Sequence, residues 1–218
     1  MLLAIDTTTR FAGIALYNED GLRLEQLWET GNNHTVELIP YIVRACEEQA
    51  VNPTDLQAVA VALGPGSFTG LRVGLSVAKG LALALRIPVL GVPSLDAAAY
   101  AHRRDPLPVC AVLPAGRARW CVGFYEVIDG QWQRCGDYLL AAVPEIASRL
   151  MRPTLLCGEI TNELAQILTA SVPDNAVVAG PAAAVRRTGY VAELAWQRYT
   201  RGEQDDLSTL APIYLQHA

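Results

Sequence analysis

Two rounds of the same element order run through this sequence and limit the folds open to it. In the first round, three strand-like segments come first, at residues 2–5, 12–17 and 22–28, and the third follows the hairpin signal Asp20-Gly21. A helix is predicted next at residues 35–49, where apolar residues follow the i, i+3, i+4, i+7 spacing. This beginning predicts an antiparallel meander that packs against a helix.

After the first helix the pattern changes to alternating strands and helices. Residues 58–63 form an apolar run without a polar face, which is typical of a strand buried on both sides. A long helical pattern at 69–85, a strand at 88–92 and a helix at 95–102 complete the first round. Three antiparallel strands followed by such alternation indicate a mixed sheet covered by helices, as in ribonuclease H-like folds.

The second round starts after the polar, proline-rich stretch 103–108. Its predicted elements are strands at 109–113 and 120–127, a third segment from Trp132 towards 138–140, a helix at 144–150, a strand at 154–157, a helix at 162–169, a strand at 176–179 and a helix at 183–199. We therefore expect an α/β protein of two ribonuclease H-like lobes, 1–104 and 105–218, with the last helix packing back on the first lobe.

The charge composition argues against direct binding of nucleic acid by this chain. The 218 residues include 22 acidic and 17 basic ones, a formal net charge of −5, and 51% are hydrophobic. Such a chain is too apolar to be disordered, and it has no Lys/Arg block to grip a phosphate backbone. We expect any nucleic acid to be bound through a partner.

The sequence contains no uninterrupted apolar run of the ~18 residues that a membrane span needs, and no basic segment precedes the apolar N-terminus. We therefore expect a cytoplasmic protein without membrane contact. The cysteines form no C-x-x-C pair, and we interpret them as buried free thiols: Cys46, Cys110, Cys121, Cys135 and Cys157.

The turn after the first strand, residues 6–10, is a candidate phosphate site. Its acidic residue and hydroxyls, Asp6, Thr7 and Thr8, lie between two strands, where backbone N–H groups can hold an anion and a carboxylate can meet a metal through water. The alternative is that Asp and Thr are good turn residues that bond their own backbone.

A glycine-rich loop at residues 64–72 follows the buried strand and is a second candidate. Its glycines allow a sharp turn and a close approach, and the following helix start favours an anion. The loop lacks the Gly-Lys-Ser/Thr ending of a Walker loop and misses the dinucleotide fingerprint by one residue, so a tight strand-to-helix connection is the alternative. The residues concerned are Gly64, Gly66, Ser67, Phe68, Thr69, Gly70 and Arg72.

Small residues line one face of the helix after this loop, at Gly70, Gly74, Ala78 and Ala82. A glycine inside a helix costs about 0.5–1 kcal/mol relative to alanine, so a close approach by another element is expected. That element is either the chain's own sheet or a second subunit.

The sequence shows no catalytic apparatus. The histidines, His34, His102 and His217, are far apart and form no ligand pair with one another or with a cysteine, so we expect no metal site. No G-x-S-x-G elbow or other nucleophile arrangement is present. We therefore expect no catalytic residues in this chain.

Several of these segments together resemble the TsaB (YeaZ) family. They are Ile5-Asp6-Thr7-Thr8, the helix start from His34 to Pro40, the loop from Gly64 to Arg72, Ala78-Lys79-Gly80-Leu81-Ala82, Gly91-Val92-Pro93-Ser94-Leu95-Asp96 and a tail similar to the family's Pro-x-Tyr-Leu at Pro212–Leu215. The loop is the most specific part. The resemblance implies a two-lobe fold of the actin, sugar kinase and Hsp70 type.

The resemblance also implies a role. Members of this family serve the synthesis of threonylcarbamoyl-adenosine in transfer RNA, next to the anticodon, as non-catalytic paralogues of TsaD. TsaD carries the metal and transfers the threonylcarbamoyl group, and TsaE is an ATPase that joins the pair. This chain alone is expected to bind no cofactor, whereas ATP or ADP and transfer RNA are expected in the complex.

By the same resemblance, the partner surface lies on the helices predicted at 35–49 and 69–85. It is expected to serve TsaD, or a second copy in a homodimer when the chain is alone. The expected interface residues are His34, Leu38, Ile42, Leu71, Gly74, Val77, Ala78 and Leu81.

Two positions depart from the family. The segment Pro114–Arg119 lacks the Asp of the family's Asp-Ala-Arg, and Gln216 replaces a final Arg. Two alternatives to a scaffold are kept: an ATP-dependent phosphotransferase that uses Asp6 and Thr7, and a glycoprotease. The lack of a metal-ligand pair or a nucleophile argues against the glycoprotease.

Overall fold

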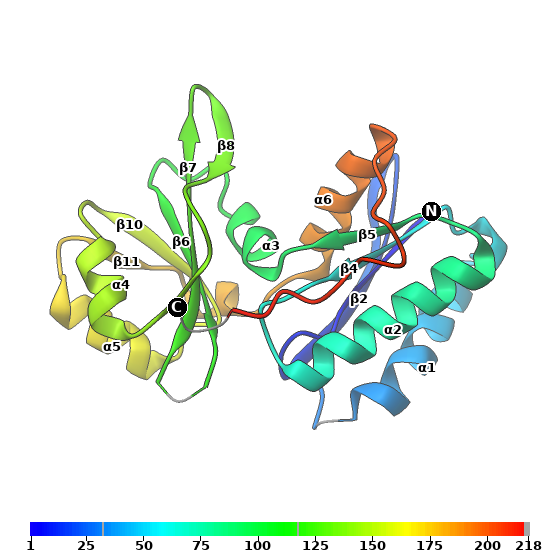
Figure 1. Ribbon diagram of the computed structural model, residues 1–218, viewed down its shortest axis with the longest axis horizontal. Coiled ribbons are helices and arrows are strands. Elements are labelled where there is room, and N and C mark those ends of the chain that lie inside the picture. The colour runs from blue at the N-terminus through cyan, green and yellow to red at the C-terminus, as the bar shows by residue number, and fades with distance from the viewer. Residues whose placement is uncertain (32, 117, 216–218) are drawn as a thin grey trace. The chain divides into compact units, whose positions relative to one another are not determined.

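The computed structural model describes residues 1–31, 33–116 and 118–215. It divides the chain into two compact units (Figure 1). Unit 1 consists of Met1–Ala97 and Arg187–Ile213, and unit 2 of Ala98–Arg186 with the chain end from Tyr214. These bounds differ from the expected lobes 1–104 and 105–218, because the chain returns to unit 1 after Arg186.

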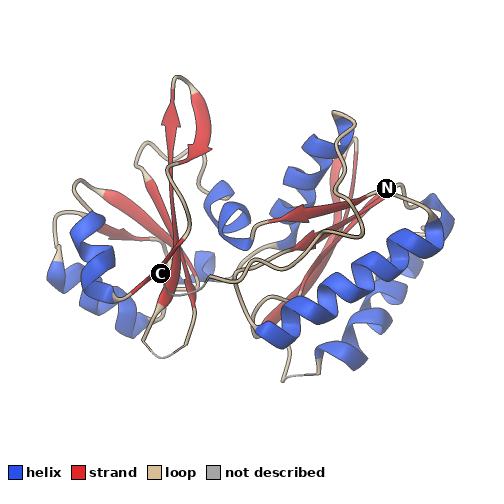
Figure 2. Cartoon of the chain, in the orientation of Figure 1, coloured by secondary structure: helices blue, strands red, loops and turns tan. Residues whose placement is uncertain are grey.

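The helices and strands follow the expected order, except that two strands stand where one third segment was predicted in the second round (Figure 2). The strands are β1 (Leu2–Asp6), β2 (Phe11–Asn18), β3 (Gly21–Glu29), β4 (Ala58–Ala62), β5 (Val89–Val92), β6 (Val109–Pro114), β7 (Trp120–Ile128), β8 (Gln131–Arg134), β9 (Leu139–Ala141), β10 (Thr154–Gly158) and β11 (Ala176–Val178). The helices are α1 (His34–Glu48), α2 (Phe68–Leu85), α3 (Ser94–Tyr100), α4 (Val143–Arg149), α5 (Asn162–Ser171) and α6 (Thr188–Thr200).

Unit 1 is a five-stranded sheet in the order β3-β2-β1-β4-β5. Strands β1, β2 and β3 are antiparallel neighbours, whereas β4 and β5 continue the sheet in parallel with β1. Helices α1 and α2 cover one face, where Ile5 and Leu38 share a core cluster, and α6 covers the other, where Ala60 packs with Val191. Burial on both faces explains why β4 has no polar residue.

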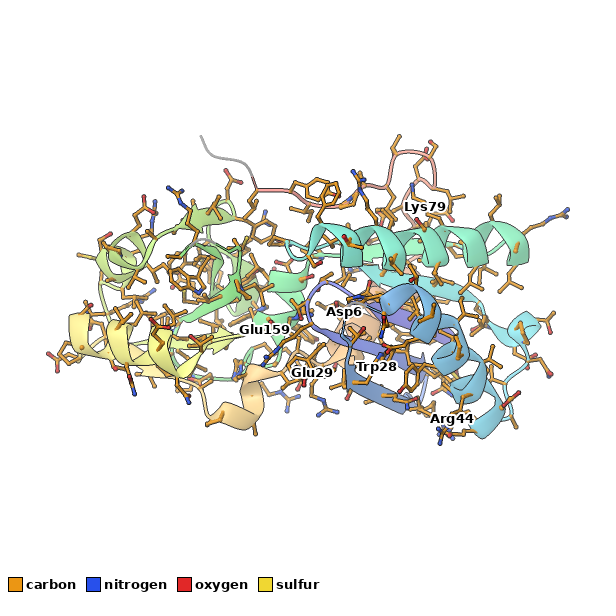
Figure 3. All side chains as sticks on the ribbon, turned by 90° about the horizontal axis from the view of Figure 1, so that it is seen from below. Asp6, Trp28, Glu29, Arg44, Lys79 and Glu159 are labelled. Atoms are coloured by element: carbon orange, nitrogen blue, oxygen red, sulfur yellow. The ribbon has the colours of Figure 1, made fainter. Side chains whose placement is uncertain are left out.

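Helix α1 is tied to the sheet by an aromatic contact. The Trp28 ring of β3 stacks on Tyr41 with 4.1 Å between ring centroids, and its Nε1–H donates to Glu37 Oε2 at 3.0 Å. Figure 3 shows Trp28 on the α1 side of the unit and α1 lying beside α2. The two helices therefore form one layer.

The predicted start of the last helix was wrong. Residues Pro181–Ala184 form a separate 3₁₀ turn, and α6 begins at Thr188. Its start is set by Glu25 of β3, whose carboxylate accepts the N–H of Gly189 at 2.7 Å and pairs with Arg187. A carboxylate at a helix N-terminus satisfies a free N–H and the helix dipole.

Unit 2 has a sheet in the order β11-β10-β6-β7-β8, with β9 paired to β7. Helices α4 and α5 supply Ile146 and Leu164 to the core on one face. The predicted single third segment was wrong: Gly136, at φ +77°, lies between β8 and β9, and the two strands pair with different ends of β7. Only glycine takes this backbone conformation without cost.

The five cysteines are free. Burial raises the pKa of Cys157 to about 12 and that of Cys121 to about 11, which keeps both thiols neutral. Cys135 is only partly buried and donates to Glu126 Oε1. Cys121 lies opposite Leu113 and Leu140 in the sheet register.

Helix α2 is long and apolar enough to cross a membrane, by length and composition only. It carries Arg72 and Lys79, and its inner residues Leu71 and Ala78 are buried in unit 1. A core helix of a soluble protein passes the same test.

After α6 the chain runs back along β5 as residues 203–213, called the strap. The Asp205 N–H donates to Val89 O at 3.0 Å, and the Asp205 carboxylate accepts the Gly91 N–H at 2.7 Å and Arg198 at 2.8 Å. Burial raises the pKa of Asp205, but the hydrogen bonds from Arg198 and Gly91 to its carboxylate outweigh it, so its pKa is below the usual value. The charged carboxylate therefore stabilises the fold.

We expect Asp205→Asn to lower the free energy of unfolding by about 1 kcal/mol at pH 7. A carboxyl with a lowered folded-state pKa stabilises the protein above its unfolded pKa, and this contribution disappears as the pH falls through the folded pKa. The difference from wild type should therefore shrink below about pH 4. Urea titrations at several pH values measure it, with the exposed Asp174→Asn as control; a difference independent of pH would contradict the assignment.

Candidate functional site

The turn after β1 is buried and bonded to itself. Asp6, Thr7 and Thr8 are 3%, 2% and 0% exposed. The Asp6 carboxylate accepts the Thr8 N–H at 2.9 Å and the Thr8 hydroxyl at 2.6 Å. This is the local turn bonding that the sequence offered as the alternative to a phosphate site.

The start of α2 lies directly on this turn. The Thr7 hydroxyl donates to Gly70 O at 2.7 Å, and the Ser67 N–H donates to Thr8 O at 2.6 Å. A Cβ added at Gly70 would lie 2.0 Å from Thr7 O, and one added at Gly66 would lie 2.2 Å from Thr8 O. Because both neighbours are backbone atoms, only glycine fits at these two positions.

The same contact explains the inner part of the small-residue face. A Cβ at Gly74 would lie 2.3 Å from the Thr7 hydroxyl, and Ala78 is fully buried in the core of unit 1. The close approach predicted from the sequence is therefore made, for Gly70, Gly74 and Ala78, within the chain.

Ser94, at the start of α3, links the loop to the turn. Its N–H donates to Gly64 O at 2.8 Å, and its fully buried hydroxyl accepts the Gly64 N–H at 3.2 Å and donates to Thr8 Oγ1 at 3.3 Å. The sequence marked Ser94 only as part of a family motif, because nothing in its own neighbourhood shows that it meets a turn 86 residues away.

His34 joins α1 to the same network. Its ring Nε2 lies 3.1 Å from Thr9 O, and the residue is 5% exposed. His34 thus contacts the turn from the start of α1, while Gly70 contacts it from the start of α2.

Most of the expected interface residues face the core. Leu38, Ile42 and Leu71 are at most 6% exposed. Those buried inside unit 1 are His34, Leu38, Ile42, Leu71, Gly74 and Ala78, whereas Val77 and Leu81 are partly buried. The burial of these six residues leaves them no surface for a partner and corrects that part of the expected set, whereas for Val77 and Leu81 the expected interface stays a prediction.

The exposed part of the glycine-rich loop lies at the start of α2. Ser67, Phe68, Thr69 and Arg72 are exposed, and the Arg72 guanidinium lies 3.7 Å from the centroid of the Phe68 ring. The Ser67 hydroxyl caps α2 by accepting the Gly70 N–H at 3.3 Å. The loop therefore has an inner side that holds the turn and an outer side open to solvent.

Some residues named in the sequence analysis lie outside this network or outside the described residues. Arg117, Gln216 and His217 lie outside the described residues. In the described part of the departing segment, the Ala115 N–H donates to Arg119 O at 2.9 Å. Within the described ranges, no three His, Cys, Asp or Glu side chains come close enough to share a metal ion.

The glycines of α2 give a matched test of this packing. We expect Gly70→Ala to destabilise the protein by about 1–3 kcal/mol, because the new methyl group meets the backbone of Thr7. Gly80→Ala, on the same helix, should stabilise it by about 1 kcal/mol, because apart from its chain neighbours and the helix's own backbone no described atom lies within 4 Å of its Cβ position. Thermal unfolding measures both; equal effects would contradict the packing.

The turn also predicts the outcome of nucleotide titration. Asp6 is engaged by Thr8, and Gly66 and Gly70 rest on the turn's own carbonyl groups, so a phosphate there requires the loop to move. We expect calorimetry of the isolated chain with ATP and Mg²⁺ to show no binding tighter than about 1 mM. Tighter binding that Thr7→Val removes, with the fold intact, would support the phosphotransferase alternative.

Comparisons with known proteins identify relatives of this chain. The sequence model described as TsaD, tRNA N6-adenosine threonylcarbamoyltransferase, matches residues 29–197. The tRNA threonylcarbamoyladenosine biosynthesis protein TsaB of Bacillus subtilis is 30% identical over 220 residues, which cover 100% of this chain and 94% of that protein. TsaB of Escherichia coli is 38% identical over 94 residues, 43% of this chain and 40% of that protein.

A solved structure of YeaZ from Pseudomonas aeruginosa matches with a TM-score of 0.78 and 25% identity, covering 97% of this chain and 99% of that one. The match thus extends over both units. These relatives match over nearly the whole length of the chain, and both of its sheets are mixed. This chain therefore belongs to the TsaB (YeaZ) family and has the two-lobe fold of the actin, sugar kinase and Hsp70 type.

Proposed function

We propose that this chain acts in the biosynthesis of threonylcarbamoyladenosine in tRNA as a non-catalytic subunit that binds TsaD through the outer face of α1 and α2. The names of its relatives support the pathway. The observation that supports the surface is a set of apolar side chains that α1 and α2 leave exposed.

Three of these side chains lie on α1. Val36 is 68% exposed, Ile39 44% and Val43 50%, and their spacing places them on one side of the helix. Leu83 of α2 is 69% exposed. The two helices lie side by side in one layer (Figure 3). Neighbouring exposed apolar residues are typical of protein interaction sites.

Gly80 is a second observation on the same face. It is exposed within α2, and apart from its chain neighbours and the helix's own backbone no described atom lies within 4 Å of the position of a Cβ there. A glycine at an open helix position costs about 1 kcal/mol relative to alanine, and the packing that explains Gly70 does not apply to it. A helix of a partner that approaches closely supplies a reason.

The distribution of charge supports the proposal that other subunits of the complex hold the tRNA. Unit 1 has 9 basic and 14 acidic residues, and 9 − 14 gives the whole net charge of −5, whereas unit 2 has 8 of each. A net negative lobe repels a phosphate backbone. In this proposal the complex, in the cytoplasm, holds tRNA; TsaD supplies the chemistry, TsaE joins as the ATPase, and ATP or ADP binds in the complex. Without TsaD, the same face pairs two copies.

The interface is tested by Val43→Asp and Gly80→Trp, both on the outer face. Each puts a charge or a bulky ring into the expected contact, so we expect the affinity for TsaD to fall at least about tenfold. Met151→Asp is the matched control, because Met151 is 83% exposed on unit 2, and it should leave the affinity unchanged. Binding to immobilised TsaD or calorimetry measures the affinities, and thermal unfolding checks that each variant is folded.

Wild-type affinity in both outer-face variants would contradict the proposed surface. Failure of the unaltered chain to associate with TsaD would contradict the proposed function itself. Size-exclusion chromatography of the chain alone measures its oligomeric state, and the same two variants should convert the expected dimer to a monomer.

A further inference from the structure

The strap ends at the residue that begins the glycine-rich loop. The Ile213 N–H donates to Leu63 O at 2.8 Å, and Leu63 is the residue between β4 and Gly64. A Cβ added at Gly64 would lie 3.2 Å from Ile213 O. The end of the strap therefore touches both residues from which the loop starts, and Figure 1 shows it running back past β5.

The middle of the strap reaches the same place through a side chain. Leu207 and Leu210 pack against the core cluster beneath α1 and α2. A Cβ added at Gly91 would lie 2.4 Å from Leu63 Cδ1 and 2.8 Å from Leu210 Cδ1. The side chains of Leu63 and Leu210 therefore both lie over Gly91, so the strap approaches Leu63 with a side chain as well as with the backbone bond.

The beginning of the strap is held by hydrogen bonds of Asp205. Asp205 is bonded to Val89, Gly91 and Arg198, as described above. Next to it lies a cavity of about 600 Å³ between the end of α2 and the strap, with Leu83, Arg86, Asp205 and Leu207 in its lining. The strap thus borders open space at its start and is packed where it meets Leu63.

We propose that the strap is a positioning element for the Gly64–Arg72 loop. By holding Leu63 through Ile213 and Leu210, it fixes where the loop leaves β4, and the loop in turn sets the start of α2 on the buried turn. Releasing the strap end loosens the loop while the sheet and the rest of unit 1 stay folded. The consequence for partner binding rests on the proposed function; the effect on the loop does not.

The proposal is tested by hydrogen exchange on the full chain. Ile213→Pro removes the N–H that bonds to Leu63 O, whereas Ile213→Ala keeps that N–H and removes the side chain. We expect the amides of Ser67, Gly70 and Leu71 to exchange about tenfold faster in Ile213→Pro, the factor that the loss of one backbone hydrogen bond gives. Ile213→Ala should exchange as wild type there, and α6 should be unchanged in both.

Leu210→Ala is the second variant. It shortens the side chain that lies with Leu63 over Gly91 and keeps the Ile213 N–H to Leu63 O bond, so it should speed exchange of the same loop amides even where Ile213→Pro does not fold. Unchanged loop exchange in folded Ile213→Pro, or in Leu210→Ala, would overturn the proposal. So would an equal increase throughout unit 1, because that is a general loss of stability.

Affinity for TsaD separates this inference from the proposed function. We expect Ile213→Pro to bind TsaD at least about threefold more weakly than Ile213→Ala. A loosened loop with unaltered affinity would overturn the link to partner binding. Absence of binding by the wild-type chain would instead contradict the proposed function and leave the exchange result valid.

Discussion

The contact between the start of α2 and the turn after β1 is the constraint on which unit 1 depends. Thr7 donates its hydroxyl to Gly70 O, Ser67 donates its N–H to Thr8 O, and the Cβ positions of Gly66 and Gly70 are already filled by turn carbonyls. The contact therefore fixes the ends of β1 and β4, the glycine-rich loop and the start of α2 relative to one another. A helix fixed this closely on its inner side presents the outer side as a defined surface.

A turn of Asp and Thr residues after the first strand, as seen here, has the composition of a phosphate-binding turn, yet in this chain its groups are bonded within the lobe. The Asp6 carboxylate holds Thr8, and Ser94 adds a hydroxyl to the same network. The polar groups thus serve to position α2. This use of a binding-type turn as a structural joint is consistent with a subunit that works by presenting a surface, the role proposed above.

The sequence predicted the elements well and the facing of the helices poorly. Alternating apolar residues and turn signals located the strands, and the apolar run at β4 predicted its burial on both faces. On α1, however, Leu38 and Ile42 face the core while Ile39 and Val43 face outward, and both rows are apolar. A pattern of hydrophobicity cannot tell which of two adjacent apolar rows faces inward. The start of α6 was also beyond local reasoning, because the capping residue, Glu25, lies 164 positions from Gly189.

The most direct test of the account is a reconstituted threonylcarbamoyl transfer to tRNA in which this chain is titrated against a fixed amount of TsaD, with TsaE and ATP present. A subunit that acts by binding its paralogue should be required, and the rate should level off when the chain and TsaD are equimolar. Product formation at full rate without this chain, or formation by the chain without TsaD, would contradict the account.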